Sequence, residues 1–349
     1  MFEDLGFETL TAPQAALWFG GVIGLAFGLL AERTKFCFRR GLVGEDRRQA
    51  LGLWLTALAV AVIGTQAGVF AGLISFDDHR FMVSDMPVLA IALGGVLFGA
   101  GMILTRGCIS RLTVLTASGN LRGLTVLLVF AITAHATLKG VLAPARVAAG
   151  TVTLPMGESI SLAALPGGPL LWTVLIGGAA LFAGLRSGNR STHLLMAALI
   201  GLLAPAAWIG TGFVLYDDFD PIAMESLSFT SPAAETLFWT IASTSISAGF
   251  GTGLVGGTFV GALLASLAFR TFRWQSFESP RQTRRYIAGG VLMGVGGVLA
   301  GGCTLGAGLS GVPTLSVAAL LGIMSIALGG IVTGRLVDGI APRLRPVYS

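Results

Sequence analysis

Long apolar stretches recur along the whole chain and constrain its fold more than any other feature. Each approaches the roughly 20 residues that a helix needs to cross a bilayer. Only 11% of the 349 residues are Asp, Glu, Lys or Arg, against about 25% in soluble domains. So little charge cannot cover a soluble protein of this size, which excludes a soluble enzyme and a nucleic-acid-binding module. The stretches lie at about 14–31, 50–74, 88–105, 121–140, 169–186, 193–213, 236–269, 286–302 and 314–334.

We therefore predict an all-α polytopic membrane protein with about nine transmembrane helices, in a single transmembrane domain over residues 1–349. The seventh stretch is too long for one straight helix, and its small, polar middle at 243–253 predicts a break. The connections on one side hold 19 Lys and Arg residues, and those on the other side hold three. This asymmetry predicts an inner-membrane protein with its N-terminus outside and its C-terminus in the cytoplasm. The net charge of +5 follows from this topology and requires no nucleic-acid partner.

Two segments of the chain are copies of each other. Residues 94–108 align without gaps on residues 289–303, nine of the 15 positions are identical, and both copies end in Gly-Cys. Chance similarity between two glycine-rich apolar stretches is the alternative. Because the copies are the third and eighth spans, they cross in opposite directions. We predict an inverted internal repeat with one half at about 14–140, a connector span at about 169–186 and a second half at about 193–334.

The three cysteines all lie at predicted helix ends. Cys108 and Cys303 end the two copies, and Cys37 follows the first span in a basic segment. A free cysteine often fills a gap as a small apolar side chain, but two repeat-related positions favour a function. The chain has no CxxC pair, metal-ligand spacing, P-loop or nucleophile elbow, so we expect no disulfide framework, metal, cofactor or enzyme activity.

The segments 109–118 and 304–312, which follow Cys108 and Cys303, are too short to cross about 30 Å of hydrocarbon. We predict that they form short re-entrant helices whose free N–H groups and positive ends face a cavity. The glycines beside these cysteines would let an anion approach the main chain, although close helix packing is the other use of such glycines. For the glycines within 94–101 and 289–297 we favour packing.

A neutral thiol is a weak S–H donor and suits a soft, sulfur-bearing anion better than a hard oxyanion. Three basic residues adjoin the cysteines, Lys35, Arg106 and Arg111. They could guide such an anion, or they could simply belong to the positive inner face of the membrane. The predicted spans contain no acidic residue of the kind that usually relays protons or sodium, so the sequence identifies no coupling ion.

At these residues the chain resembles the YeeE/YedE family of inorganic sulfur-compound transporters. The resemblance rests on three motifs in order on an apolar scaffold: Lys35-Phe-Cys-Phe38, Arg106-Gly-Cys108 and Gly301-Gly-Cys-Thr-Leu-Gly306. It implies thiosulfate uptake, with the three cysteines lining a central path and passing the ion along by transient S–H contacts. It also implies a partner, a small cytoplasmic sulfur-carrier-like protein.

Residues and resemblance together predict a substrate-binding set in the bilayer-embedded chain: Cys37, Cys108, Cys303, Gly107, Gly302, Thr304, Arg111 and Lys35. Transport of another sulfur or selenium species is an open alternative. A membrane thiol-redox protein is a second one, which the wide separation of the cysteines in sequence disfavours. A passive channel for neutral solutes would not require thiols at symmetric positions.

Overall fold

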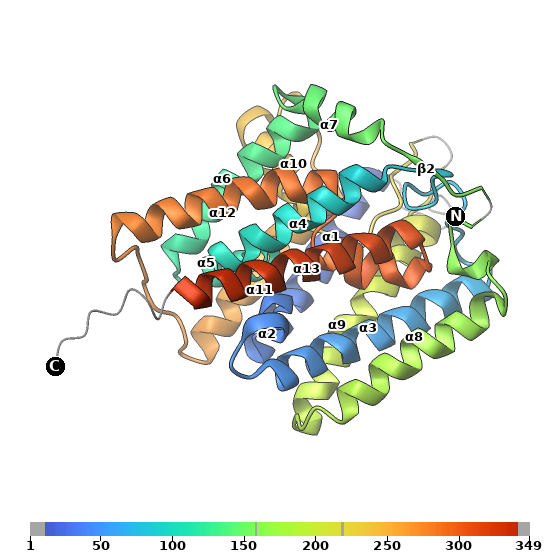
Figure 1. Cartoon of the computed structure of the whole chain (residues 1–349), viewed down its shortest axis with the longest axis horizontal. Coiled ribbons are helices and arrows are strands. Elements are labelled where there is room, and N and C mark those ends of the chain that lie inside the picture. The colour runs from blue at the N-terminus through green and yellow to red at the C-terminus, as the bar shows by residue number, and fades with distance from the viewer. Residues whose placement is uncertain (1–10, 158, 218–219, 341–349) are drawn as a thin grey trace.

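The computed structural model describes residues 11–157, 159–217 and 220–340, and these residues are predominantly helical (Figure 1). Among them, nine helical segments are long and apolar enough to cross a membrane. The predicted fold class, an all-α polytopic membrane protein, is therefore confirmed. The predicted locations of the two termini concern residues outside the described ranges. The long helices are α1 (Ala12–Thr34), α3 (Arg47–Phe70), α4 (Val88–Leu104), α6 (Leu121–Lys139), α8 (Gly168–Leu185), α9 (Ser191–Ile209), α11 (Phe250–Ala268), α12 (Pro280–Leu299) and α13 (Val317–Ile340).

Shorter elements connect or interrupt these helices. They are α2 (Phe38–Val43), α5 (Ile109–Ala117), α7 (Ala143–Gly150), the 3-10 helix η2 (Leu162–Ala164), the π-helical turn η3 (Gly210–Val214), α10 (Thr230–Ala242), the π-helix η4 (Thr304–Gly311) and the 3-10 helix η5 (Val312–Thr314). Two short strands, β1 (Asp85–Met86) and β2 (Leu154–Pro155), pair antiparallel. The seventh apolar stretch is divided as predicted, because α10 ends at Ala242 and α11 begins at Phe250.

Local chemistry sets several helix ends. The side chains of Asn120 and Ser279 accept hydrogen bonds from the first turns of α6 and α12, which satisfies N–H groups that lack partners within the helix. Proline stands in the first turn of α1, α8 and α12, where its missing N–H costs no hydrogen bond.

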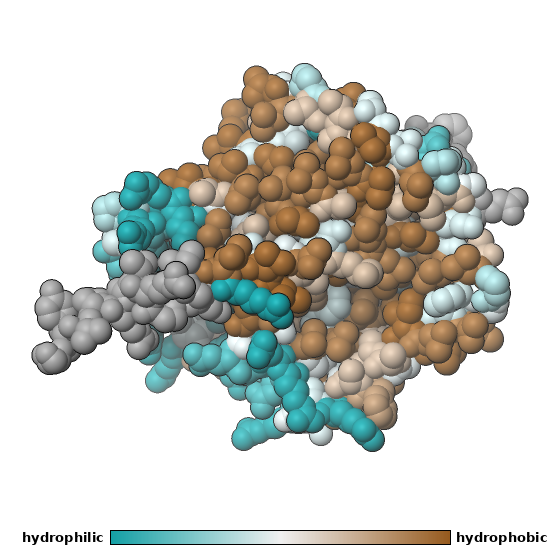
Figure 2. Space-filling model, in the orientation of Figure 1, coloured by the Kyte–Doolittle hydropathy of each residue, from teal (hydrophilic) through white to brown (hydrophobic). Residues whose placement is uncertain are grey.

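Apolar side chains cover most of the visible surface, and hydrophilic ones gather at one end of the helices (Figure 2). Large exposed side chains such as Ile132, Leu170, Val174, Leu264 and Leu328 lie on the long helices. In water a surface of this kind would aggregate. A bilayer solvates it.

Glycines let pairs of long helices approach backbone to backbone. On α1 and α11 they recur every fourth residue, and an added Cβ would overlap the backbone of the facing helix at each of them: Gly20, Gly24 and Gly28 on α1, and Gly253, Gly257 and Gly261 on α11. This is the small-residue packing that replaces hydrophobic burial within lipid.

The two sequence copies pack directly on each other as α4 and α12. Gly94 faces Ala300, whereas Gly101 faces Gly289, so the helices run antiparallel. The glycines interpreted as packing contacts do pack. Other contacts come in matched pairs: α1 packs on α11 as α9 packs on α3, and α4 packs on α13 as α12 packs on α6. Figure 1 shows α12, α4 and α13 running side by side.

Candidate functional site

Each of the three cysteines occupies the residue immediately before a short helix. Cys37 precedes α2, Cys108 precedes α5, and Cys303 precedes η4. The two short helices predicted after Cys108 and Cys303 are present. Because the first N–H groups of a helix have no partner within it, the starts of α5 and η4 carry a positive potential beside a thiol.

The chain turns in the same way before each cysteine. Lys35, Arg106 and Gly301, each two residues before a cysteine, have φ angles of 51°, 60° and 71°. In the first two turns, the next residue's N–H closes the preceding helix by bonding the carbonyl of Ala31 or Met102. A left-handed conformation costs a non-glycine residue about 1–2 kcal/mol. Lys35 and Arg106 therefore hold strain that glycine avoids at the third turn.

The thiols are buried, and two of them lie together. Exposed fractions are 8% for Cys37, 2% for Cys108 and 0% for Cys303, and all three thiols are free. The side chains of Cys37 and Cys108 interact with each other, and Cys108 also interacts with Thr304. The Cys108 Sγ atom lies 3.3 Å from the Ser110 Oγ atom. The fold thus brings the start of α5, which follows the first copy, close to the start of η4, which follows the second copy.

The glycine before each repeat cysteine leaves space at a helix start. A Cβ on Gly302 would lie 3.0 Å from the backbone nitrogen of Ala307, and one on Gly107 would lie 3.2 Å from the Leu112 Cδ2 atom. A backbone atom cannot move aside as readily as the end of a leucine. Glycine is therefore required more strictly at 302 than at 107.

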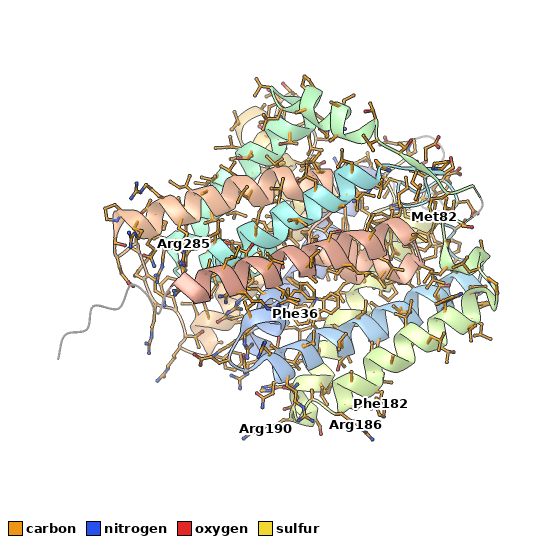
Figure 3. The ribbon with its side chains drawn as sticks, viewed as in Figure 1. Phe36, Met82, Phe182, Arg186, Arg190 and Arg285 are labelled. Atoms are coloured by element: carbon orange, nitrogen blue, oxygen red, sulfur yellow. The ribbon has the colours of Figure 1, made fainter. Side chains whose placement is uncertain are left out.

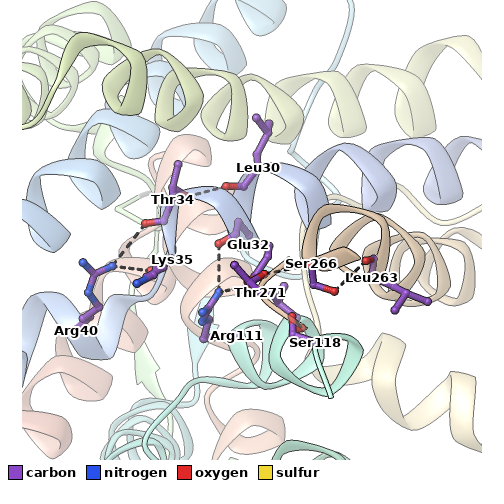
Figure 4. A network of polar contacts seen from close by, with 12 residues as sticks. Leu30, Glu32, Thr34, Lys35, Arg40, Arg111, Ser118, Leu263, Ser266 and Thr271 are labelled. Atoms are coloured by element: carbon purple, nitrogen blue, oxygen red, sulfur yellow. Dashed lines mark hydrogen bonds and ion pairs between the residues drawn. The ribbon is translucent and has the colours of Figure 1, made fainter. Parts of the chain in front are cut away.

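The two basic residues of the predicted binding set have other contacts. Arg111 Nη1 lies 3.2 Å from Glu32 Oε2 and donates to the Ala31 carbonyl, which ties α5 to α1 (Figure 4). The Lys35 carbonyl accepts a hydrogen bond from Arg40, and the Lys35 side chain is exposed. The structure thus gives Arg111 an anionic partner, and a role for either residue in anion binding stays a prediction.

A group of three arginines, here called the Arg39 cluster, lies close to Cys37 and consists of Arg39, Arg106 and Arg285. Arg106, Arg285 and the Cys37 side chain all act electrostatically on Arg39. The Nε atoms of Arg39 and Arg285 are buried without a hydrogen-bond partner among the described residues. Figure 3 shows Arg285 at one end of the helices, and Met82 lies toward the other end. The cluster is a concentration of positive charge at one end of the molecule.

A cavity of about 660 Å³, here called the Arg80 pocket, is hollowed between the α3–α4 connection and the start of α10. Arg80, Glu225 and Glu235 line it, and Gly306 and Ser310 bring η4 to it. A Cβ on Gly306 would lie 2.8 Å from the Ser228 Oγ atom. Arg80 also borders a second cavity of about 340 Å³ that reaches Gly301. Arg80 therefore borders both the Arg80 pocket and a second cavity, which reaches the turn before Cys303.

The charges of the pocket perturb one another. Burial lowers the pKa of Arg80, while the carboxylates of Glu225 and Glu235 and the nearby Cys303 side chain raise it. Burial and the neighbouring Glu235 raise the pKa of Glu225 to about 7, against the opposing effect of Arg80. Burial, with the charge of Arg80, lowers the pKa of His79 to about 4. At neutral pH His79 is thus uncharged, and Glu225 is close to half protonated.

Sequence reasoning missed the Arg80 pocket and, apart from Arg106, the Arg39 cluster. Arg80 is one of only three basic residues in the connections predicted to lie outside. Because Lys and Arg are scarce in outer connections, the presence of Arg80 there could have indicated a functional role. Glu225 and Glu235 join it only through the fold. Arg39 and Arg40 are adjacent in the sequence, but the structure gives them different partners, because Arg40 pairs with Asp46 and Arg39 does not.

Interrupted helices, buried thiols and helix starts within an apolar bundle define a membrane transport protein. Residues 33–332 match the model of the family described as "Sulphur transport", and the chain belongs to this family. It is a transporter of sulfur compounds and not an enzyme.

Three curated proteins illustrate the relationship. The thiosulfate transporter TsuA of Escherichia coli is 28% identical over 343 residues, which cover 89% of this chain and 91% of that protein. TsuA of Spirochaeta thermophila is 26% identical over 338 residues, covering 90% and 96%. The probable transporter YedE of Escherichia coli is 32% identical over 111 residues, covering 31% and 26%.

Proposed function

We propose that this protein takes up thiosulfate into the cytoplasm through a path lined by Cys303, Cys108 and Cys37. One observation carries the proposal: three free, buried thiols each stand at the start of a short interior helix. The names of the two TsuA relatives, which match about nine-tenths of the chain, support thiosulfate as the substrate.

The chemistry of the path fits a dianion with one soft end. Thiosulfate carries oxygen atoms at one end and a polarisable sulfur atom at the other. The helix starts of α5 and η4 stabilise its negative charge through backbone N–H groups. A thiol supplies a weak, short-range S–H donor to the terminal sulfur, so the ion is held at each cysteine without being trapped there.

The arrangement of the charges suggests the order of steps. The Arg80 pocket faces outside, Cys303 follows it, Cys108 and Cys37 come next, and the Arg39 cluster faces the cytoplasm. This order agrees with the excess of Lys and Arg in the connections on the Arg39 side. With this order we propose an inner-membrane protein whose N-terminus lies outside and whose C-terminus lies in the cytoplasm. The antiparallel contact of α4 with α12 supports an inverted repeat of halves 14–140 and 193–334 joined by 169–186 within a single domain.

The cytoplasmic end is where a partner would receive the ion. We propose that a small sulfur-carrier-like protein docks there, as the family resemblance implies. Exposed arginines surround this end, among them Arg47, Arg48 and Arg106. They would attract an acidic partner surface and steer its approach.

Growth tests the proposal. Cells that lack every other route of thiosulfate uptake are grown with thiosulfate as the sole sulfur source, with and without this gene. Growth should depend on the gene, whereas growth on cysteine should not. Growth on another sulfur or selenium species but not on thiosulfate would contradict thiosulfate as the substrate.

A further inference from the structure

The Arg80 pocket holds a guanidinium whose charge no close partner cancels. Arg80 forms no ion pair with any of the described residues, and its guanidinium carbon lies 5.3 Å from the centroid of the Phe81 ring. Protein surrounds Arg80 closely enough to lower its pKa, yet its side chain remains exposed to the cavity. A charge that is partly desolvated and still accessible is suited to bind an anion.

Two carboxylates share this cavity with Arg80. Glu225 precedes α10 and Glu235 lies on it, and both act electrostatically on the guanidinium. The Glu225 main chain is fixed by two hydrogen bonds with the Thr211 hydroxyl, at 2.8 and 3.0 Å. Its side chain is half-buried, whereas Glu235 is exposed. Two negative charges here would repel a dianion approaching Arg80 unless one of them were neutralised.

The other titratable groups of the pocket do not supply that neutralisation. The α3–α4 connection contributes Asp77, Asp78 and His79. The aspartates are exposed at the rim, and His79 is wedged against Trp208, with ring centroids 5.1 Å apart. Its pKa of about 4 keeps it neutral throughout the physiological range. Cys303, which precedes η4, also acts on Arg80. Glu225, whose pKa is raised to about 7, is the group that takes up a proton near neutrality.

We propose that the Arg80 pocket captures a divalent sulfur oxyanion together with one proton, the anion on Arg80 and the proton on Glu225. This inference rests on the proposed function and adds the coupling ion that the sequence leaves unidentified. A bound anion repels the Glu225 carboxylate and so favours its protonation, and protonation removes the carboxylate that competes for Arg80. The two binding events therefore strengthen each other by the same factor. Co-transport of the proton also lowers the charge that must enter a negatively charged cell from two to one.

The pH dependence of uptake gives the first test. Initial rates of labelled thiosulfate uptake are measured in proteoliposomes of the full-length protein between pH 6 and pH 8. If capture needs protonated Glu225, KM should rise about tenfold from pH 6 to pH 8, since the competent fraction falls by that factor. Glu225→Gln should abolish this rise. Glu235→Gln should retain the rise but move it to lower pH, because Glu235 raises the pKa of Glu225.

Glu278→Gln is the matched control. It makes the same isosteric change at an exposed glutamate that pairs with Arg122, far from the pocket in sequence and on the connection before α12. At each pH its KM should equal the KM of the unmodified protein. A Glu225→Gln variant whose KM still rises tenfold would overturn the inference.

Proton counting provides a second test that needs no variant. Calorimetry of thiosulfate binding to the unmodified protein, in two buffers of different ionisation enthalpy, measures the protons taken up per anion. We expect close to one proton per anion at pH 8 and much less than one at pH 6. Binding without proton uptake at pH 8 would overturn the inference while leaving thiosulfate transport intact. Absence of thiosulfate uptake at every pH would instead overturn the proposed function, and this inference with it.

Discussion

The two ends of the molecule both set arginine near a thiol, but only the Arg80 pocket sets it beside carboxylates with which it forms no ion pair. In the Arg80 pocket, Glu225 and Glu235 act on Arg80 without forming an ion pair. In the Arg39 cluster, the groups that act electrostatically on Arg39 are Arg106, Arg285, Cys37 and Tyr286, and none of them is a carboxylate. The acids nearby are already engaged, Glu32 with Arg111 and Asp46 with Arg40. The Arg80 pocket can therefore lose a negative charge by taking up a proton, whereas the Arg39 cluster stays positively charged.

We propose that this difference gives each end a separate role in transport. A pocket whose net charge depends on protonation can capture an anion and let it go. A cluster of arginines without free acids keeps a constant attraction for anions and for acidic surfaces. The thiols lie between these ends, with Cys303 on the Arg80 side and Cys37 beside the Arg39 cluster.

The largest expected effects lie between the two ends, at the thiols. Cys108→Ala and Cys303→Ala each leave a void of about one atom, which should cost on the order of 1 kcal/mol of stability or less. Loss of one stabilising position on a narrow path should raise the barrier by about 3 kcal/mol and slow uptake roughly a hundredfold. The readout is uptake per inserted protein, with Ser variants expected to rescue it in part.

Cys37→Ala should also fail to support uptake. Near-normal uptake rates in the Cys108 and Cys303 variants would show that these side chains only pack. That result would contradict a path of thiols between the two ends.

The second effect separates the ends themselves. Arg80→Gln removes a charge-assisted contact worth about 2 kcal/mol, so kcat/KM for thiosulfate should fall roughly thirtyfold, mainly through KM. Arg39→Gln acts after capture, so it should lower kcat and leave KM nearly unchanged. An equal rise of KM in both variants, measured by initial uptake rates, would contradict the assignment of capture to the Arg80 end.

The smallest effect concerns the two glycines before the repeat cysteines. Gly302→Ala places a Cβ 3.0 Å from the Ala307 nitrogen, whereas the Cβ in Gly107→Ala meets the end of the Leu112 side chain. Only the Cβ added at position 302 would press on backbone atoms at the start of a helix. Uptake should therefore fall several-fold for Gly302→Ala and less than twofold for Gly107→Ala. The reverse order would show that the helix start of η4 does not contact the ion.

Much of the scaffold follows from the sequence, because hydropathy and local chemistry determine it. Apolar length predicts the nine spans, and the small, polar residues at 243–253 predict the break that the structure shows between α10 and α11. The segments after Cys108 and Cys303 are too short to span a bilayer, which predicts the short helices there. The antiparallel contact between α4 and α12 is the one that copies crossing in opposite directions would make.

The charged ends do not follow from the sequence in the same way. Arg80, Glu225 and Gly306 come from three distant segments, and no local pattern brings them together. The left-handed turns at Lys35 and Arg106 are hidden because long side chains seldom adopt positive φ. Comparison with Gly301, at the same distance from its cysteine, is the signal that reveals them. The pairing of Arg111 with Glu32 likewise depends on the packing of α5 against α1.

Competition between thiosulfate and sulfate tests the central claim most directly, because the two dianions have a similar shape and differ in the terminal atom that we propose the thiols contact. Labelled thiosulfate uptake by the unmodified protein is measured with excess unlabelled thiosulfate or excess sulfate. Neutral thiols that recognise the terminal sulfur predict strong competition by thiosulfate and weak competition by sulfate. Sulfate that competes as strongly as thiosulfate, or is itself taken up at the same rate, would contradict recognition by cysteine and leave only the helix starts and Arg80 to bind the ion.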